Sequence, residues 1–309
     1  MRNAGRLANQ SQGLSLWNTR GMTILLLGMA ACILPLMIGY VSAKLSPTMS
    51  QQAAALLALV FPAFVLAMIQ SRMLVPYTLV VWAIGPEIRR VMDWMEGTYH
   101  SVSLLSVAPL LAGAMIIIPV LRSIHHVDKP LARAVLYFGV ALGYGSLIGL
   151  AKNGMGFAYD LANYVIPLLL LPYFAVRPFS PKDLDRLLYA YANIATLVAI
   201  YGIIQYLTVP PWDAFWMNHV EMNSIGMPYP LEIRVFSTLN SPGPCAAFLA
   251  LALVPMLMEK RWRGTLGWVG LILTVTGLLI TLVRSAWLVV FVMLLLYIVT
   301  SASKGKWKT

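Results

Sequence analysis

Charged side chains are scarce in this chain, and acidic ones are the scarcest. Only 11% of its 309 residues are charged, with 11 Asp and Glu against 22 Lys and Arg, whereas 60% are hydrophobic. A soluble domain carries about a quarter charged residues, so this composition excludes an ordinary water-soluble fold. The net charge of +11 does not indicate nucleic-acid binding, because the basic residues stand in short loops between apolar runs.

Cysteine is also rare, and its scarcity excludes several site types. The chain has two cysteines, Cys32 and Cys245, and both lie in apolar runs. So few cysteines exclude a disulfide framework and predict simple apolar packing. The sequence has no cysteine pair with zinc-ligand spacing, no phosphate-binding loop and no dinucleotide fingerprint, so we predict neither a metal site nor a cofactor.

Long apolar runs are what the chain has in place of charge. Most approach the length that crosses about 30 Å of hydrocarbon, and spanning segments of this kind must be helices. We therefore predict an all-α fold, a polytopic transmembrane bundle of about ten helices in the cell inner membrane, with residues 1–309 as one domain. The predicted spans are Met22–Val41, Ala53–Ile69, Met73–Ile84, Val102–Leu121, Ala134–Leu150, Leu161–Val176, Leu187–Leu207, Pro244–Met258, Leu266–Val283 and Ala286–Val299.

The distribution of Lys and Arg predicts the orientation of this bundle. With a cytoplasmic N-terminus, 16 of the 22 basic residues fall in cytoplasmic segments, as the positive-inside rule requires. Both termini are then inside, with segments 1–21 and 301–309 in the cytoplasm and the long loop 208–243 in the periplasm. Membrane lipids are the expected surroundings.

The first half of the loop 208–243 is rich in tryptophan. Trp212 and Trp216 stand in the stretch PPWDAFWM. Interfacial aromatic residues often anchor a segment at the membrane surface, and aromatic faces also stack on sugar rings. Both interpretations stay open at this stage, and the second makes Trp212 and Trp216 candidate substrate-binding residues.

The second half of the loop combines an arginine with small polar residues just before an apolar helix. Arg234 follows Glu232 and precedes Ser237, Asn240 and Ser241. A helix N-terminus favours anions, because its free N–H groups and its dipole point at the ligand. The pattern predicts a site for a phosphate-like group, while pairing of Arg234 with Glu232 or with lipid phosphate is the alternative.

Two further groups of outer basic residues need an interpretation. Arg284 stands between two apolar runs, where an arginine faces a polar cavity or a partner, or else snorkels to the surface. The segment 84–100 predicts an amphipathic surface helix with local ion pairs and a structural role, and contact with a glycan or with lipid phosphate is the alternative. Its charged residues are Glu87, Arg89, Arg90, Asp93 and Glu96.

Two stretches of this sequence resemble the O-antigen ligase and polymerase family. They are RVFSTLNSPGPCAAFLALALVPML, which begins at Arg234, and LITLVRSAWLVV around Arg284. They occur in the order expected of that family, one helical hairpin apart. The segments PPWDAFWM and PEIRRVMDW further resemble its exopolysaccharide polymerase-like branch.

The resemblance implies a function on the outer face of the membrane. Members of this family transfer a glycan from an undecaprenyl-pyrophosphate carrier to an acceptor sugar, and arginines hold the pyrophosphate. The matching positions, Arg234 and Arg284, are the expected catalytic residues. The implied partners are a lipid-linked oligosaccharide and other polysaccharide export and assembly proteins. The residues expected to bind substrate are Glu232, Ser237, Asn240, Ser241, Trp212 and Trp216.

One feature of the family is missing from this sequence. In the family, a second large outer loop with a histidine follows the helix of Arg284, whereas this sequence stops one helix later, at Thr309. We therefore expect the chain to be either the N-terminal part of a longer protein or a degenerate copy of such a protein. The alternative function is a secondary transporter or channel. The nearly charge-free apolar runs argue against it, because ion coupling uses intramembrane acidic residues.

Overall fold

The computed structural model describes residues 47–303 except 102, 128 and 155. The predicted span Met22–Val41, the segment 1–21, Cys32 and residues 304–309 of the predicted tail lie outside this part of the chain. The described residues fold into helices and no strand, which confirms the all-α prediction. Five helical stretches are long and apolar enough to cross a membrane, as expected of a membrane protein.

The nine predicted spans within the described residues all fall on helices, but only some are long enough to span alone. The five long apolar stretches are Met49–Met68, Leu104–Arg122, Lys129–Lys152, Gly156–Val176 and Pro181–Thr208. Three shorter apolar helices follow them, so the predicted count of about ten spans stays a prediction. The helices are α2 Pro47–Met68, α3 Leu74–Glu96, α4 Ala108–Ala114, α5 Ile117–Arg122, α6 Lys129–Asn153, α7 Gly156–Leu168, α8 Leu170–Val176, α9 Pro181–Thr208, α10 Pro211–His219, α11 Pro242–Met258, α12 Gly267–Ile280 and α13 Arg284–Ser303, with short 3-10 turns η1 Leu104–Val107, η2 Ile124–His126, η3 Asn223–Ile225 and η4 Lys260–Trp262.

Local sequence explains where the longest helix, α9, begins and ends. Ser180 caps its N-terminus and forms a capping box with Asp183, and Pro181 occupies the first helical position. At the other end, Val209 adopts a left-handed conformation with φ 45°. Pro210 follows at once and cannot continue the helix. The segment between α9 and α11 therefore starts at a defined point.

Prolines also divide two of the predicted spans into shorter helices. A proline removes a backbone hydrogen bond, and its ring collides with the carbonyl four residues earlier. Pro119 stands four residues after Met115, where α4 gives way to α5. Pro172 stands four residues after Leu168, where α7 gives way to α8.

The structure corrects the prediction of a separate surface helix over 84–100. The predicted third span and this segment form one continuous helix, α3, which runs from Leu74 to Glu96 and ends at Gly97 in a left-handed conformation. The local ion pairs are present, but Arg90 and Asp93 are buried rather than displayed on a surface. Hydropathy alone did not reveal this continuation, because the second half of α3 is polar.

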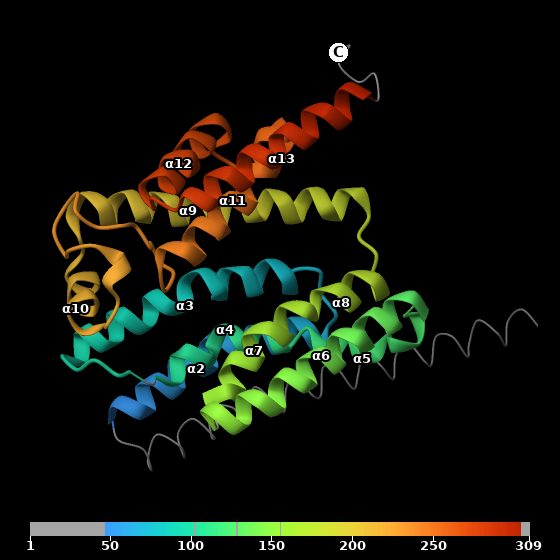
Figure 1. Cartoon of the computed structure of the whole chain (residues 1–309), viewed down its shortest axis with the longest axis horizontal. Helices are drawn as coiled ribbons and strands as arrows, with labels where there is room; N and C mark the ends of the chain where they lie inside the picture. The colour runs from blue at the N-terminus through green and yellow to red at the C-terminus, as the bar shows by residue number, and fades with distance from the viewer. Residues whose placement is uncertain (1–46, 102, 128, 155, 304–309) are drawn as a thin grey trace, which may run out of the picture.

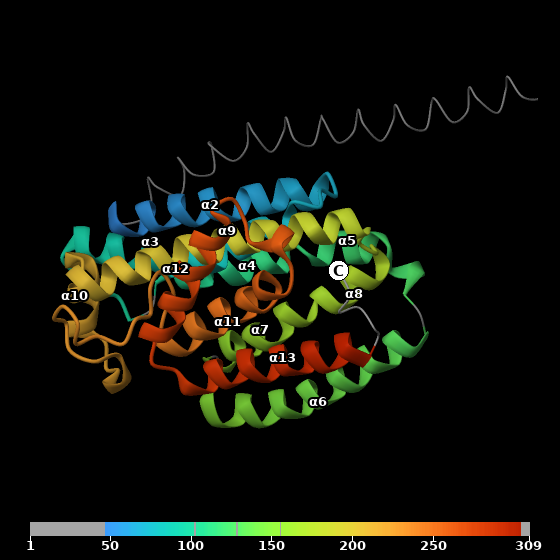
Figure 2. The ribbon, with the colours of Figure 1, turned by 90° about the horizontal axis from the view of Figure 1, so that it is seen from above.

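Helix α3 lies between two groups of helices (Figure 1). It packs on α9 and α10 on one side and on α2 and α4 on the other. One apolar core joins α9, α11, α12 and α13, and a second joins α2, α3, α4, α5 and α8. Turned by 90°, the bundle shows α6 on its periphery (Figure 2), where most side chains are exposed, as suits a helix that faces lipid.

Four basic residues tie the connections at one end of the bundle. Arg72, between α2 and α3, pairs with Asp183 at the start of α9. Arg122 donates to the carbonyl oxygen of Met68 over 2.8 Å. Two more contacts join the same end: Arg177 to the Gln70 carbonyl and Arg261 to Asp185. The connections that follow α2, α5, α8 and α11 thus lie at one end of the bundle. The opposite end carries α10 and the segment before α11 (Figure 1).

Candidate functional site

The C-terminal end of α3 is tied to the loop 208–243 by a buried arginine. Arg90 is only 1% exposed. It donates to the carbonyl oxygens of Leu239 (2.6 Å) and Ser237 (2.5 Å). It also forms ion pairs with Glu87 and with Asp213, whose Oδ1 is 2.9 Å from Nε. These contacts agree with the structural role that the sequence predicted for the charged residues of segment 84–100, in the case of Arg90.

Asp213 of α10 is the acidic centre of this network. It accepts hydrogen bonds from the Tyr201 hydroxyl and from Gln205 Nε2, each over 2.8 Å. Burial raises the pKa of Asp213 to about 6, against the lowering effect of Arg90 and with a further increase from Glu87. Burial thus favours the protonated form of this carboxyl group more than water does.

Residues 235–239 pass through the interior. The Ser237 hydroxyl is buried and donates to the carbonyl oxygen of Val198 over 2.6 Å. The Ser237 backbone adopts φ 53°, a left-handed value that is uncommon outside glycine. The Phe236 and Ser237 amides both donate to Gln205 Oε1, at 3.2 and 2.8 Å. An over-determined, strained segment of this kind is a feature of functional sites.

Arg234, one of the two predicted catalytic residues, packs against the turn that precedes the other. Its Nη2 donates to the carbonyl oxygen of Leu282 over 3.4 Å, and the Val235 amide donates to that of Ile280 over 3.3 Å. Leu282 has φ 57° and lies two residues before Arg284. The Nε of Arg234 is buried and has no hydrogen-bond partner among the described residues. The fold thus brings together two stretches that are distant in the sequence.

Arg284 stands at the first position of α13 and is exposed. Its guanidinium makes no hydrogen bond or ion pair to any residue that the structure describes. Ala286, in the first turn of α13, packs in the same core as Leu239 and Cys245, beside the start of α11. The N-termini of α11 and α13 therefore lie on the same side of the molecule as Arg234, where their dipoles add to the positive charge.

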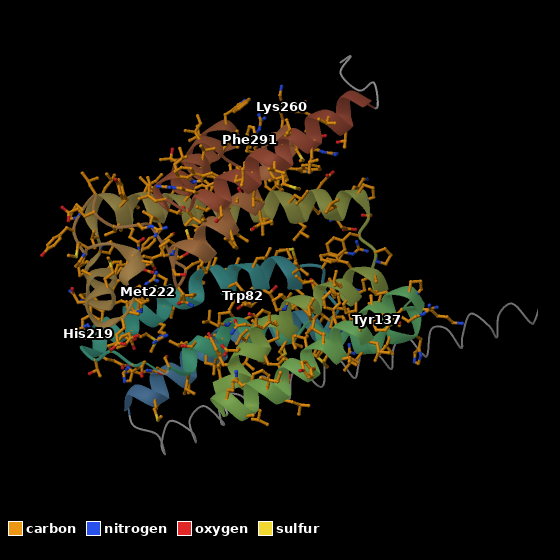
Figure 3. All side chains as sticks on the ribbon, viewed as in Figure 1. Trp82, Tyr137, His219, Met222, Lys260 and Phe291 are labelled. Atoms are coloured by element: carbon orange, nitrogen blue, oxygen red, sulfur yellow. The ribbon has the colours of Figure 1, made fainter. Side chains whose placement is uncertain are left out.

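A cavity of about 350 Å³ lies beside the segment 234–241, of which Leu239 and Asn240 contribute to the lining. Its lining joins α3, α4 and α7 to the loop 208–243, and Trp82 and Met222 of that lining are labelled in Figure 3. Two of the predicted substrate-binding residues, Trp216 and Asn240, contribute to it. Neither Arg234 nor Arg284 does.

Arg89 is the basic residue of this cavity, and the sequence prediction favoured a structural role for it over contact with a glycan or lipid phosphate. Its Nη1 donates to the Ser106 hydroxyl over 3.1 Å and its Nη2 to the carbonyl oxygen of His100. Its guanidinium also lies 5.9 Å from the centre of the Tyr99 ring. The signal that could have identified it is the doublet of arginines in a predicted outer loop.

The remaining predicted residues differ in how accessible they are. Trp216 is buried against Phe236, with ring centres 5.1 Å apart. Trp212 is half-buried, donates its Nε1–H to Glu87 Oε1 over 2.6 Å, and contacts Trp94 edge-on. Their indole rings thus serve first in packing, and stacking on a sugar stays a prediction.

Three polar residues of the loop remain open to a ligand. Glu232 and Asn240 are exposed, and Ser241 is half-buried at the N-terminal cap of α11, where its side chain makes no capping hydrogen bond. Pro242 occupies the first helical position, so α11 begins two residues earlier than predicted. Asn240 and Ser241 are therefore the predicted substrate-binding residues that lie nearest a free helix N-terminus.

A group of titratable side chains at the end of α3 was not predicted. Asp93, Glu96 and His100 have ligand atoms that all lie within 4.8 Å of one another. Glu96 and His100 stand four residues apart, a spacing that the sequence prediction of no metal site overlooked.

Comparison with known proteins gives no relative: no family model, no curated protein and no solved structure matches this chain.

Proposed function

We propose that this protein is a membrane glycan polymerase or ligase that transfers an oligosaccharide from an undecaprenyl-pyrophosphate carrier to an acceptor glycan on the periplasmic face. In this proposal the bundle has about ten spans with both termini inside. The observation that carries the proposal is the packing of Arg234 against the turn of Leu282, two residues before Arg284. Two arginines from distant stretches, near two helix N-termini, suit a dianionic leaving group.

The proposed reaction assigns these residues to charge stabilisation. An acceptor hydroxyl attacks the anomeric carbon of the lipid-linked sugar, a glycosidic bond forms, and the bond from that carbon to the phosphate oxygen breaks. The electron pair and the negative charge leave with undecaprenyl pyrophosphate, and the hydroxyl proton passes to a base. Fixed cations such as Arg234 and Arg284 stabilise the charge that develops on the leaving group.

The cavity next to this site suits the glycan. It combines aromatic rings with hydrogen-bonding side chains, including Tyr99, Tyr159, Asn163 and Asn240. The segment 234–241 carries a cation at one end and lines the cavity at the other, so one segment would contact both parts of a lipid-linked sugar. We accordingly assign Asn240 and Ser241 to substrate binding and Ser237 to positioning of the segment.

The alternative function, a secondary transporter, needs a carboxylate that changes its partner during the cycle. Asp213 is buried and acidic, but Arg90 holds it at 2.9 Å and two further residues donate to it. A carboxylate fixed in this way favours the structural interpretation over ion coupling.

The test is complementation of a host that lacks its own exopolysaccharide polymerase. The full reading frame is expressed as wild type and as Arg234→Ala, Arg284→Ala and the two Arg→Lys variants. The matched control is Arg186→Ala, an exposed arginine at the opposite end of the bundle. Lipid-linked and secreted glycans are compared on one gel, with protein levels measured in the membrane fraction.

The proposal expects long chains from wild type and the control, and single repeat units on the carrier from both alanine variants. Lysine should restore little, because it lacks the planar fork of donors that matches a phosphate. Normal polymer from either alanine variant would remove that arginine from the site. No change in glycans from any variant, wild type included, would make transport the leading hypothesis.

A further inference from the structure

The outer end of α3 gathers three metal-ligating side chains at one point. Nδ1 of His100 lies 3.0 Å from Asp93 Oδ1 and 3.6 Å from Glu96 Oε2. Asp93 and Glu96 belong to the last turn of α3, and His100 stands three residues after the capping Gly97. A carboxylate pair and an imidazole in this arrangement surround a space in which one small cation would touch all three.

The two carboxylates are buried without adequate partners. The Glu96 side chain is 9% exposed, and neither of its carboxylate oxygens has a hydrogen-bond donor among the described residues. The Asp93 side chain is 1% exposed, and its Oδ2 has no hydrogen bond, with Arg89 Nε at 3.7 Å. Buried carboxylate oxygens are unfavourable unless a donor or a metal ion compensates them. These orphaned atoms point to a missing positive charge.

The local charge balance also indicates that a positive charge is missing next to Asp93 and Glu96. Arg89 supplies one positive charge against the two carboxylates, so the cluster carries one net negative charge when His100 is neutral. The cluster also sits at the C-terminal end of α3, where the helix dipole favours cations. Among the described residues, His100 is the only basic side chain that pairs with Glu96.

We propose that Asp93, Glu96 and His100 bind a divalent transition-metal cation, of which Zn²⁺ is the best match. Zinc takes imidazole and carboxylate ligands in tetrahedral sites, often with three protein ligands and one water. His100 is 30% exposed, which leaves room for that water. In this site His100 coordinates through Nδ1 and keeps Nε2 toward solvent.

The cation would fix the loop that shapes the cavity. The carbonyl oxygen of His100 accepts a hydrogen bond from Arg89, and both Arg89 and the neighbouring Tyr99 line the cavity. Coordination of the His100 ring therefore sets the position of Arg89 through the backbone. This role is structural, and metal binding can be measured whether or not the protein transfers a glycan.

The competing explanation is a protonated His100 that bridges the two carboxylates without any metal. Both explanations use the same three residues, so loss of activity in a variant does not distinguish them. A direct measurement of metal binding does.

The experiment uses the full chain in detergent, without a histidine tag and stripped with a chelator. Co²⁺ is titrated as a spectroscopic probe, followed by displacement with Zn²⁺, and bound metal is counted after desalting. Glu96→Gln and His100→Gln remove one ligand each while keeping the side-chain size. His125→Gln and Glu221→Gln are the matched controls, because both residues are exposed and outside the cluster.

The proposal expects one bound Co²⁺ per chain, with visible absorption bands that Zn²⁺ abolishes. Both cluster variants should weaken binding by at least about tenfold, and both controls should bind as wild type does. Binding that is equally weak in wild type and in the cluster variants, or that is lost in the controls, would overturn the site. Size-exclusion profiles identical to that of wild type would show that each variant is folded. The measured metal binding does not depend on whether the glycan-transfer proposal is correct.

Discussion

The guanidinium of Arg90 donates a hydrogen bond to the carbonyl oxygen of Leu239, 149 residues further along the chain. This contact fastens the C-terminal end of α3 to the segment that leads into α11. Because the arginine is buried and its other donors reach Ser237, Glu87 and Asp213, the segment has one defined path through the interior. That path brings Arg234 to the turn before α13.

Replacement of Arg90 with alanine should destabilise the protein strongly. Removal of one partner of a buried ion pair leaves an uncompensated charge and costs about 3–5 kcal/mol. Asp213 would be that charge. The measurement is thermal unfolding of the full chain in one detergent, with the exposed Arg186→Ala as the control. An unfolding temperature for Arg90→Ala equal to that of the control would show that the network contributes little.

Asp213 should make stability depend on pH. Burial raises its pKa from 3.8 to about 6 in the folded protein, so the folded state binds this proton more tightly than the unfolded state does. Its contribution to stability is therefore fully present below about pH 4 and is lost as the pH rises through about 6. Wild type should gain stability relative to Asp213→Asn as the pH falls from 7 to 5. Parallel stability curves for the two proteins would contradict the assignment.

Gly226→Ala should loosen the loop that carries Arg234. Gly226 has φ 82°, and an added Cβ would collide with the carbonyl oxygen of Glu232. The adjacent hydrogen bond from the Arg234 amide to the Ile225 carbonyl, at 2.8 Å, would be strained. Replacement of Gly by Ala at a position with such a conformation lowers the free energy of unfolding by more than about 1 kcal/mol.

Limited proteolysis of the detergent-solubilised protein measures that effect. We expect faster cleavage within 220–240 in Gly226→Ala and an unchanged rate in Gly243→Ala. A Cβ at Gly243 meets nothing within 4 Å and its φ is not left-handed, so it is the matched control. Equal cleavage rates in both variants would show that the left-handed turn at Gly226 does not hold the loop.

Sequence patterns were sufficient where a local rule decides the structure. The capping box of Ser180 and Asp183 with Pro181 starts α9, but the span predicted from hydropathy, Leu187–Leu207, began six residues later because it did not use these signals. The apolar runs were long enough to give the helices their approximate places. α3 was the exception, because its hydropathy changes at about residue 84 while its backbone stays helical.

The candidate site was less predictable, because its contacts join distant stretches. Nothing in the local sequence pairs Arg90 with Asp213 or places Arg234 against Leu282. The segment 84–100 showed its ion pairs in the i, i+3 and i, i+4 spacing, but burial depends on what packs over it. The spacing of Glu96 and His100 was visible in the sequence, whereas their convergence with Asp93 on one point needed the turn at Gly97.

The orientation in the membrane can be tested with single cysteines. Asn218 lies exposed on α10, and Lys182 lies exposed at the start of α9, at the other end of the bundle. The native Cys245 is buried, and Cys32 is replaced with alanine to remove its background. With a membrane-impermeant maleimide, Asn218→Cys should label in intact cells and Lys182→Cys only after permeabilisation.

This result bears directly on the proposed chemistry. The arginines at 72, 122, 177 and 261 gather at the end of Lys182, so the positive-inside rule predicts that this end lies in the cytoplasm. With that orientation, Arg234 and Arg284 would face the periplasm, where the proposed lipid-linked glycan would present its pyrophosphate. The reverse labelling pattern would put both arginines on the cytoplasmic side and would exclude periplasmic glycan transfer, whatever the arginine variants do to expression.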